Sequence, residues 1–334
     1  MKLNEHQVSK LRRALLCSIC VPLGFGLCTE AIAQDWPVKP IKIIVPYSAG
    51  GSLDNTARLL AQKLGERLMQ PVVVENITGA GGGIGFHSAR QAAPDGYTFL
   101  MAGDAPLQPN PRPGGSQYAI DVLNELQPVI LVNTAPMVLV ANPSLPAKNL
   151  ADLVALAKSR PGKLSYATAG LGTLPHLAAE MTKRAGAFDM VHIPYRGGSQ
   201  IANDVAGNQV DLAMMVAATA RPFIQTKALK PIAVTGNRRL ALFPDTAAAT
   251  ETPGFESVNL VSWAGLYAPR KTSVSIITRL NREVDAILQS TSVRESFAGA
   301  GMLPGGGVPS AFVSFIQQDR EKIGKILEVT SLRE

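Results

Sequence analysis

Cysteine is scarce in this chain, and the few cysteines stand together near one end. The three cysteines among 334 residues are Cys17, Cys20 and Cys28. Residues 34–334 therefore have neither a disulfide nor a free thiol, and this part of the chain has to fold on its core alone. A segment of that length buries enough apolar surface for such a fold, and it is long enough for two lobes.

Aromatic residues and clusters of basic residues are also scarce. Aromatic residues make up 5% of the chain, and lysine and arginine form no run. The formal charge is +7 for the whole chain. Residues 34–334 keep 28 basic and 23 acidic residues, which gives +5. Nucleic-acid binding proteins rely on clustered cations and stacking aromatics, so we expect no nucleic-acid partner. A modest positive field favours a small anionic ligand instead.

The short motifs of common catalytic and metal sites are missing. No G-x-S-x-G sequence marks a hydrolase nucleophile. His87, His176 and His192 are widely spaced and form no H-x-x-x-H or H-E-x-x-H motif, so we expect no metal site. The glycines of 79–85 are similar to a dinucleotide-binding loop, but Ile84 stands at the third glycine position. We therefore expect no cofactor and no catalytic residues.

The first 33 residues have the pattern of a cleavable signal peptide. Basic residues precede an apolar run at 14–28, and 31–33 form an A-x-A cleavage site. The apolar run is too short for a membrane span, which disfavours the alternative of an uncleaved anchor. We expect an exported protein that begins at Gln34.

Two glycine-rich turns are the most informative feature of the remaining chain. The turn at 46–54 follows a β-branched run, Ile41–Val45, and the turn at 76–85 follows Val72–Val74. Each turn leads into a segment with helical spacing of apolar residues, and we expect Ser52 to cap the first helix. Backbone N–H groups at a helix start favour anions. The two turns together predict a site that holds one anion from two sides.

The order of predicted elements indicates an α/β protein with two lobes. Strand and helix alternate through the first hundred residues and again from Leu150, which implies parallel sheets with right-handed crossovers. An apolar stretch, Val129–Val140, is long enough to run between lobes, and Val261–Tyr267 could return. We predict a signal peptide at 1–33, a first lobe at 34–136 plus 262–334, and a second lobe at 137–261. Ligands of such folds bind at the carboxyl ends of the strands.

At these loops the sequence resembles the extracytoplasmic solute receptors of tripartite tricarboxylate transporters, also called Bug receptors. The resemblance covers nearly the whole chain after the signal peptide. It rests on the order and spacing of seven segments: Val45–Asp54, Val72–Gly82, Pro94–Thr98, Pro161–Ala167, His192–Gly197, Phe243–Thr246 and Trp263–Pro269. The family implies a type II-like periplasmic binding protein fold, in which each lobe is a mostly parallel sheet flanked by helices.

The resemblance also implies which residues bind the ligand. A carboxylate is expected between the two glycine turns, held largely by backbone N–H groups and water. The first lobe contributes Tyr47, Ser48, Gly50, Gly51, Ser52, Gly79, Ala80, Gly81 and Gly82, and the second lobe contributes Thr168, Gly170, Thr173 and Tyr195. Asp104 stands where the family commonly has small hydroxyl residues, and we hypothesise that it pairs with an ammonium group of the ligand.

The function that these expectations favour is a monomeric periplasmic receptor, not an enzyme. It would capture a small carboxylate and deliver it to the membrane permease subunits of a tripartite transporter. The ligand stays open among di- and tricarboxylates, acidic amino acids and aromatic acids. An exported hydrolase that uses the same cleft is one alternative, and a ligand sensor for a signalling partner, such as a sensor kinase domain, is another.

Overall fold

The computed structural model describes residues 36–103 and 121–329. The predicted signal peptide, Gln34 and Asp104 lie outside these residues. From Pro37 onward the described residues belong to one unit. Its strands are β1 (Ile41–Val45), β2 (Val72–Asn76), β3 (Thr98–Ala102), β4 (Leu126–Ala141), β5 (Ser165–Thr168), β6 (Val191–Pro194), β7 (Leu212–Val216), β8 (Lys230–Val234), β9 (Val261–Pro269) and β10 (Leu303–Gly306).

Helices follow most of these strands. They are α2 (Ser52–Leu68), α3 (Gly83–Gln91), α4 (Val122–Glu125), α5 (Leu150–Ser159), α6 (Leu174–Gly186), α7 (Gly198–Ala206), α8 (Ala217–Gln225), α9 (Val274–Gln289), α10 (Thr291–Gly299) and α11 (Pro309–Val329), with short 3-10 turns at Ala80–Gly82 and Ala249–Glu251. No helix in the described part of the chain is both long and apolar enough to span a membrane.

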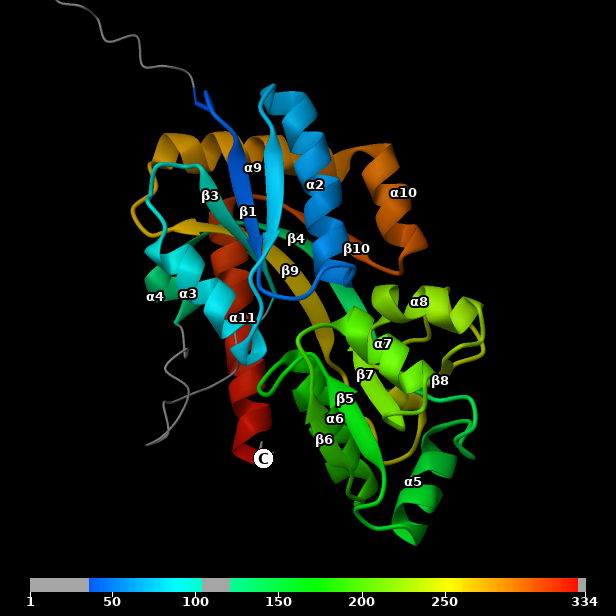
Figure 1. The fold of residues 1–334 in the computed structure, drawn as a ribbon. Coiled ribbons are helices and arrows are strands. Elements are labelled where there is room, and N and C mark those ends of the chain that lie inside the picture. Colours follow the sequence, from blue (N-terminus) through cyan, green and yellow to red (C-terminus); the bar gives the residue numbers. More distant parts are fainter. Residues whose placement is uncertain (1–35, 104–120, 330–334) are drawn as a thin grey trace, which may run out of the picture. The chain divides into compact units, whose positions relative to one another are not determined.

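Two half-sheets share the long strand β4 (Figure 1). The first half-sheet runs β2-β1-β3-β9-β4, with β10 on β4; β1, β2 and β3 are parallel, and β9 is antiparallel to β3. In the second half-sheet β6, β5 and β7 are parallel, and β7 and β8 pair antiparallel with β4. Each half-sheet is therefore parallel on one side and carries antiparallel strands next to β4.

Strand β4 changes partners along its length. It pairs with β9 from Leu126 to Pro136, and from Met137 to Ala141 it pairs with β7 and β8 instead. The strand is almost entirely buried, which explains its long apolar sequence. The chain leaves the first half-sheet along β4 and returns to it at β9.

Most of the predicted elements are present, with small differences at their ends. Asn149 caps α5 as its side-chain oxygen accepts a hydrogen bond from the Asp152 N–H at 2.9 Å. The expected cap of α2 is wrong: Gly51 is the N-cap, and Ser52 is the first helical residue. The Ser52 hydroxyl lies instead 3.6 Å from the Met302 sulfur.

Candidate functional site

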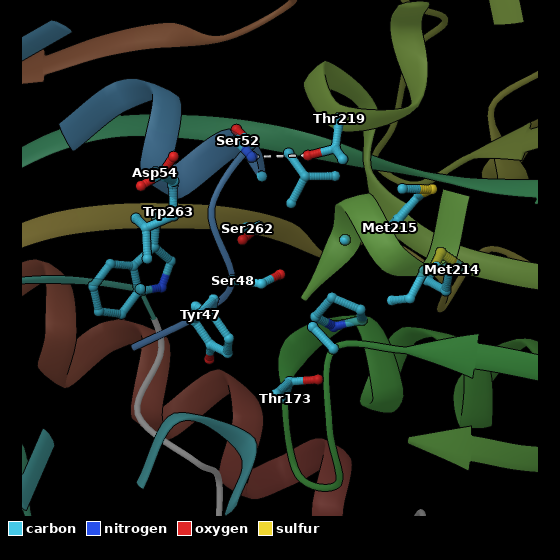
Figure 2. Close-up of a pocket in the computed structure, with 18 residues that line it drawn as sticks. Tyr47, Ser48, Ser52, Asp54, Thr173, Met214, Met215, Thr219, Ser262 and Trp263 are labelled. Atoms are coloured by element: carbon cyan, nitrogen blue, oxygen red, sulfur yellow. Dashed lines mark hydrogen bonds between the residues drawn. The ribbon is translucent and has the colours of Figure 1, made fainter. Parts of the chain in front are cut away.

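Residues from both half-sheets enclose a cavity of about 100 Å³ (Figure 2). Its walls come from the loop after β1, the start of α2, the start of β9, the loop after β5 and the starts of three further helices. The lining residues are Tyr47, Ser48, Gly51, Ser52, Leu53, Asp54, Gly103, Ala169, Thr173, Pro175, Gly198, Ile201, Met214, Met215, Val216, Thr219, Ser262 and Trp263.

Four described helices begin at this cavity. Helix α2 starts at Ser52, α6 has Thr173 as its N-cap, α7 starts at Gly198, and α8 has Val216 as its N-cap. Each helix start carries unpaired N–H groups and about half a positive charge. None of the described residues that line the cavity is a lysine, arginine or histidine. The favourable environment for an anion therefore comes from backbone dipoles.

The first glycine loop, Tyr47–Ser52, contains a buried hydroxyl group without a hydrogen-bond partner in the described part of the chain. The Ser48 hydroxyl is buried and has no partner among the described residues. The Gly50 N–H of this loop is not free, because it donates to Asp54 Oδ2 at 2.9 Å. A buried donor without a partner is costly, so a ligand acceptor at this place would be stabilising.

The same loop is fixed by contacts with the second half-sheet. The Ser52 N–H donates to Thr219 Oγ1 at 2.9 Å, the Ser48 N–H to the Arg196 carbonyl at 3.2 Å, and the Ser199 hydroxyl to the Ala49 carbonyl at 2.9 Å. The two walls of the cavity thus meet through direct hydrogen bonds. The structure has the two half-sheets closed upon the cavity.

Asp54 is the only described charged residue in the lining, and its carboxylate is already fully engaged. It is 2% exposed, and it accepts hydrogen bonds from Gly50 N–H, Arg58 Nε and Asn76 Nδ2, each at 2.9 Å. Burial opposes its ionisation, but the hydrogen bonds from Arg58, Gly50 and Asn76 outweigh burial and lower the pKa of Asp54. Asp54 is a charged residue that orders the first loop.

The second glycine loop, Gly79–Gly82, does not line the cavity. Within its turn the Gly82 N–H donates to the Gly79 carbonyl at 2.9 Å, and the next residue, Gly83, donates its N–H to the Ala80 carbonyl. Gly81 has a φ of +62°, and a Cβ there would lie 2.9 Å from the Leu171 carbonyl oxygen. This loop packs against the loop after β5, and the Tyr47 hydroxyl donates to the Gly81 carbonyl at 3.2 Å.

The predicted residues of the second half-sheet are partly separated. Thr173 lines the cavity, although its hydroxyl donates to the Gly170 carbonyl at 2.8 Å. Gly170 contacts Gly81, Thr168 is fully buried, and the Tyr195 hydroxyl donates to Asp204 at 2.6 Å. The structure brings Tyr47, Ser48, Gly51, Ser52 and Thr173 to the cavity. It places Gly50, Gly79, Ala80, Gly81, Gly82, Thr168, Gly170 and Tyr195 outside the lining.

Two histidines that are distant in the sequence stack beneath the loop after β5. The rings of His176 and His192 are 4.2 Å apart, and Tyr166 stacks on His192 at 4.9 Å. His176 Nδ1 accepts a hydrogen bond from Gly172 N–H at 3.1 Å. Burial lowers the pKa of both histidines to about 4. Both rings are therefore neutral near pH 7 and support the loop that carries Thr173.

These two histidines do not form a metal centre with their neighbours. Within 36–103 and 121–329, no group of three or more His, Cys, Asp or Glu residues is placed to hold a metal ion.

Several lining residues were not expected from the sequence. Ile201, Met214, Met215 and Thr219 belong to the second half-sheet, and all of them reach the cavity. The methionines are typical core residues by sequence, and they are 2% and 3% exposed. The helical segments α7 and α8 at the strand ends could have pointed to this wall, because ligands bind where strands hand over to helices.

Solved structures of related proteins show the class of protein to which this chain belongs. The chain is 29% identical to the periplasmic binding protein BugD, with a TM-score of 0.81 over 89% of this chain and 99% of BugD. It is 30% identical to R. palustris Rpa4515, solved with adipate, with a TM-score of 0.81 over 88% of this chain and 98% of that one. The fold is thus the two-lobed fold of periplasmic binding proteins, and the two half-sheets are its lobes.

A family model and a curated relative then give the family. The model described as "Tripartite tricarboxylate transporter family receptor" matches residues 56–332. Protein BugT of Bordetella pertussis is 33% identical over 309 residues, which are 92% of this chain and 94% of BugT. The chain belongs to the tripartite tricarboxylate transporter receptor family. It is a solute-binding receptor and not an enzyme.

Proposed function

We propose that this receptor binds a small carboxylate in the cavity between its lobes and presents it to the membrane subunits of a tripartite tricarboxylate-type transporter. The observation that carries the proposal is the start of four helices at one cavity that has no basic side chain among its described lining residues. Such a cavity stabilises negative charge through N–H groups and helix dipoles. The adipate in the related Rpa4515 structure supports a carboxylate as the ligand.

Closure of the two lobes would couple binding to delivery. The ligand would contact both walls at once, and the hydrogen bonds from the first glycine loop to Arg196, Ser199 and Thr219 support a closed state. A ligand that contacts both lobes only in the closed state shifts the population toward it. We propose that the membrane subunits recognise this closed form.

The lobes, the location and the assembly state are part of the same proposal. We propose lobes at 34–136 plus 262–334 and at 137–261, which is supported by the change of β4 partners between Pro136 and Met137. We also propose cleavage before Gln34, location in the periplasm and a monomeric receptor. Mass spectrometry of the exported protein tests the cleavage site. Size-exclusion chromatography tests the monomeric state.

A thermal-shift and calorimetric screen tests the ligand class. The full chain is expressed with its own N-terminal segment, purified from the periplasm, and unfolded and refolded to remove any bound ligand. A ligand at a hundred times its Kd adds about 2.7 kcal/mol to stability. Since 1 kcal/mol raises the Tm by roughly 2–4 °C for a domain of about 150–250 residues, a true ligand is easily seen.

Matched amides provide the control for charge. Each carboxylic acid in the panel is paired with its neutral amide, for example benzoate with benzamide. We expect binding of the acid and at least a tenfold weaker binding of the amide. Equal binding of acid and amide would show that helix dipoles do not select the ligand, and would contradict the carboxylate proposal.

A further inference from the structure

The wall of the cavity opposite the first glycine loop is apolar. Figure 2 shows Met214 and Met215 on one side of the cavity and Ser48, Ser52 and Asp54 on the other. Ile201 lies in the same apolar wall and is fully buried, and both methionines are buried too.

No described group offers a counter-charge to a second carboxylate. The described lining contains no lysine, arginine or histidine, and its one charged residue, Asp54, is itself an anion. A carboxylate pressed against methionine side chains would lose its water without gaining a partner. Asp54 does not offer a site for an ammonium group either, because Arg58, Asn76 and Gly50 occupy its oxygens.

The remaining polar groups of the lining are mostly engaged with protein atoms. The Trp263 Nε1–H donates to Asp319 at 3.0 Å, Thr219 accepts from Ser52, and Thr173 donates to Gly170. The hydroxyls of Ser48 and Ser262 form no hydrogen bond with the described residues and are left for a ligand. Figure 2 shows Ser48 and Ser262 on the same side of the cavity, away from the methionines, and two hydroxyl donors on one side suit a single carboxylate group.

We infer that the ligand is a monocarboxylate with a compact apolar body, and that Ile201, Met214 and Met215 select that body. The inference rests on the proposed carboxylate-binding function and narrows it. The cavity of about 100 Å³ is somewhat smaller than the roughly 150 Å³ apolar cavity that accommodates benzene. A short branched chain attached to the carboxylate is therefore the appropriate size.

Shape-matched pairs of acids test the inference directly. Succinate and 4-methylpentanoate have the same number and arrangement of non-hydrogen atoms, and so do adipate and 6-methylheptanoate. In each pair an isopropyl group replaces the distal carboxylate. Calorimetry on the refolded exported protein should give at least tenfold tighter binding of the branched monocarboxylate in the pair that fits the cavity.

A lysine in the apolar wall should reverse this preference. Met215→Lys keeps an unbranched side chain and brings a cation to the place where a second carboxylate would lie. We expect the variant to lose at least tenfold in affinity for the monocarboxylate and to prefer the dicarboxylate. Met215→Leu keeps the wall apolar and should preserve the original order, and Val216→Lys at a half-buried lining position replaces Met215→Lys if that variant does not fold.

The possible outcomes distinguish failure of the inference from failure of the proposed function on which it rests. Tighter binding of the branched monocarboxylates, reversed by the lysine, supports the inference. Equal or tighter binding of the dicarboxylates by the unchanged protein overturns the inference and leaves the proposed carboxylate receptor intact. If no acid of either kind binds, the proposed function fails together with the inference.

Discussion

The first glycine loop, Tyr47–Ser52, lines the cavity, whereas the second, Gly79–Gly82, packs against the loop after β5. Both loops join a strand of the first half-sheet to a helix, and both are rich in glycine. They differ in what they contact. The first loop contributes Tyr47, Ser48, Gly51 and Ser52 to the cavity lining, and in the second loop Gly81 lies against Leu171 and Gly170. Glycine in such turns therefore lines a cavity in one case and allows the close approach of two chain segments in the other.

The largest expected effect follows from a bulky side chain in the first loop. Gly51 has a φ of −75°, which any residue adopts, and a Cβ there would lie 3.6 Å from the nearest backbone oxygen. Gly51→Leu should therefore fold normally and place its side chain in the cavity. We expect at least a hundredfold loss of affinity by calorimetry, with a Tm close to that of the unchanged protein.

Gly324→Leu is the matched control for that experiment. Gly324 lies on the exposed surface of α11, and a Cβ there meets nothing within 4 Å. The control should bind the ligand as the unchanged protein does. Full affinity in Gly51→Leu would show that the first loop does not contact the ligand.

Acid pH should weaken the support beneath the loop after β5, against which the second glycine loop packs, and leave the first glycine loop unaffected. The pKa of His176 is about 4 in the folded state, below its value of about 6.5 in the unfolded chain. Between these values the unfolded chain binds a proton that the folded protein does not. Stability is therefore lost as the pH falls through 6.5 toward 4, by on the order of 2 kcal/mol at pH 5 for this residue.

Urea unfolding between pH 5 and pH 8 measures that slope. His176→Gln has no titrating group, and its amide oxygen can still accept the Gly172 N–H. We expect a shallower fall of stability with acid in this variant. An unchanged dependence of stability on pH would show that groups other than His176 cause the loss of stability in acid.

Gly81→Ala in the second loop should have a smaller effect of a different kind. Its φ of +62° disfavours any side chain, and its Cβ would press on the Leu171 carbonyl oxygen at 2.9 Å. The variant should resist closure of the lobes, which we expect to reduce affinity about tenfold. Small-angle X-ray scattering should show a more open receptor in the presence of ligand.

Gly162→Ala separates backbone strain from the contact between loops. Gly162 has a similar φ of +65°, but a Cβ there meets nothing within 4 Å. Both variants should lose stability of about 1 kcal/mol from the left-handed backbone, and only Gly81→Ala should lose affinity. Equal affinities in the two variants would mean that the second loop has no part in closure.

Much of the fold could be predicted from sequence because its signals are local. The β-branched run at Ile41–Val45 and the amphipathic pattern of α2 identify their elements directly. By contrast, α8 contains Pro222 inside the helix, and β10 has the sequence Leu303-Pro304-Gly305-Gly306. Proline disfavours a helix interior, and proline and glycine disfavour a strand, so local propensity predicts neither element. Close packing explains β10, since a Cβ at Gly305 would lie 2.3 Å from the Leu131 carbonyl oxygen.

Only one wall of the cavity could be predicted from the sequence. Gly51 and Ser48 carry a local signal, a glycine turn before a helix. Met214 and Met215 carry none, because a methionine in a buried strand looks the same whether it faces a core or a cavity. The closed contact between Gly81 and Leu171 depends on how two distant segments pack, which no local pattern records.

The smallest expected effect comes from the Ser48 hydroxyl, which is buried without a partner among the described residues. If the ligand is its missing partner, Ser48→Ala should weaken binding by about 3- to 10-fold, which corresponds to roughly one neutral hydrogen bond. The same change should leave the ligand-free protein equally stable or slightly more stable, because an unsatisfied buried hydroxyl is removed. Thermal unfolding with and without ligand measures both effects on one sample. Lower stability of the ligand-free variant would mean that the Ser48 hydroxyl has a protein partner and is not free to bind the ligand.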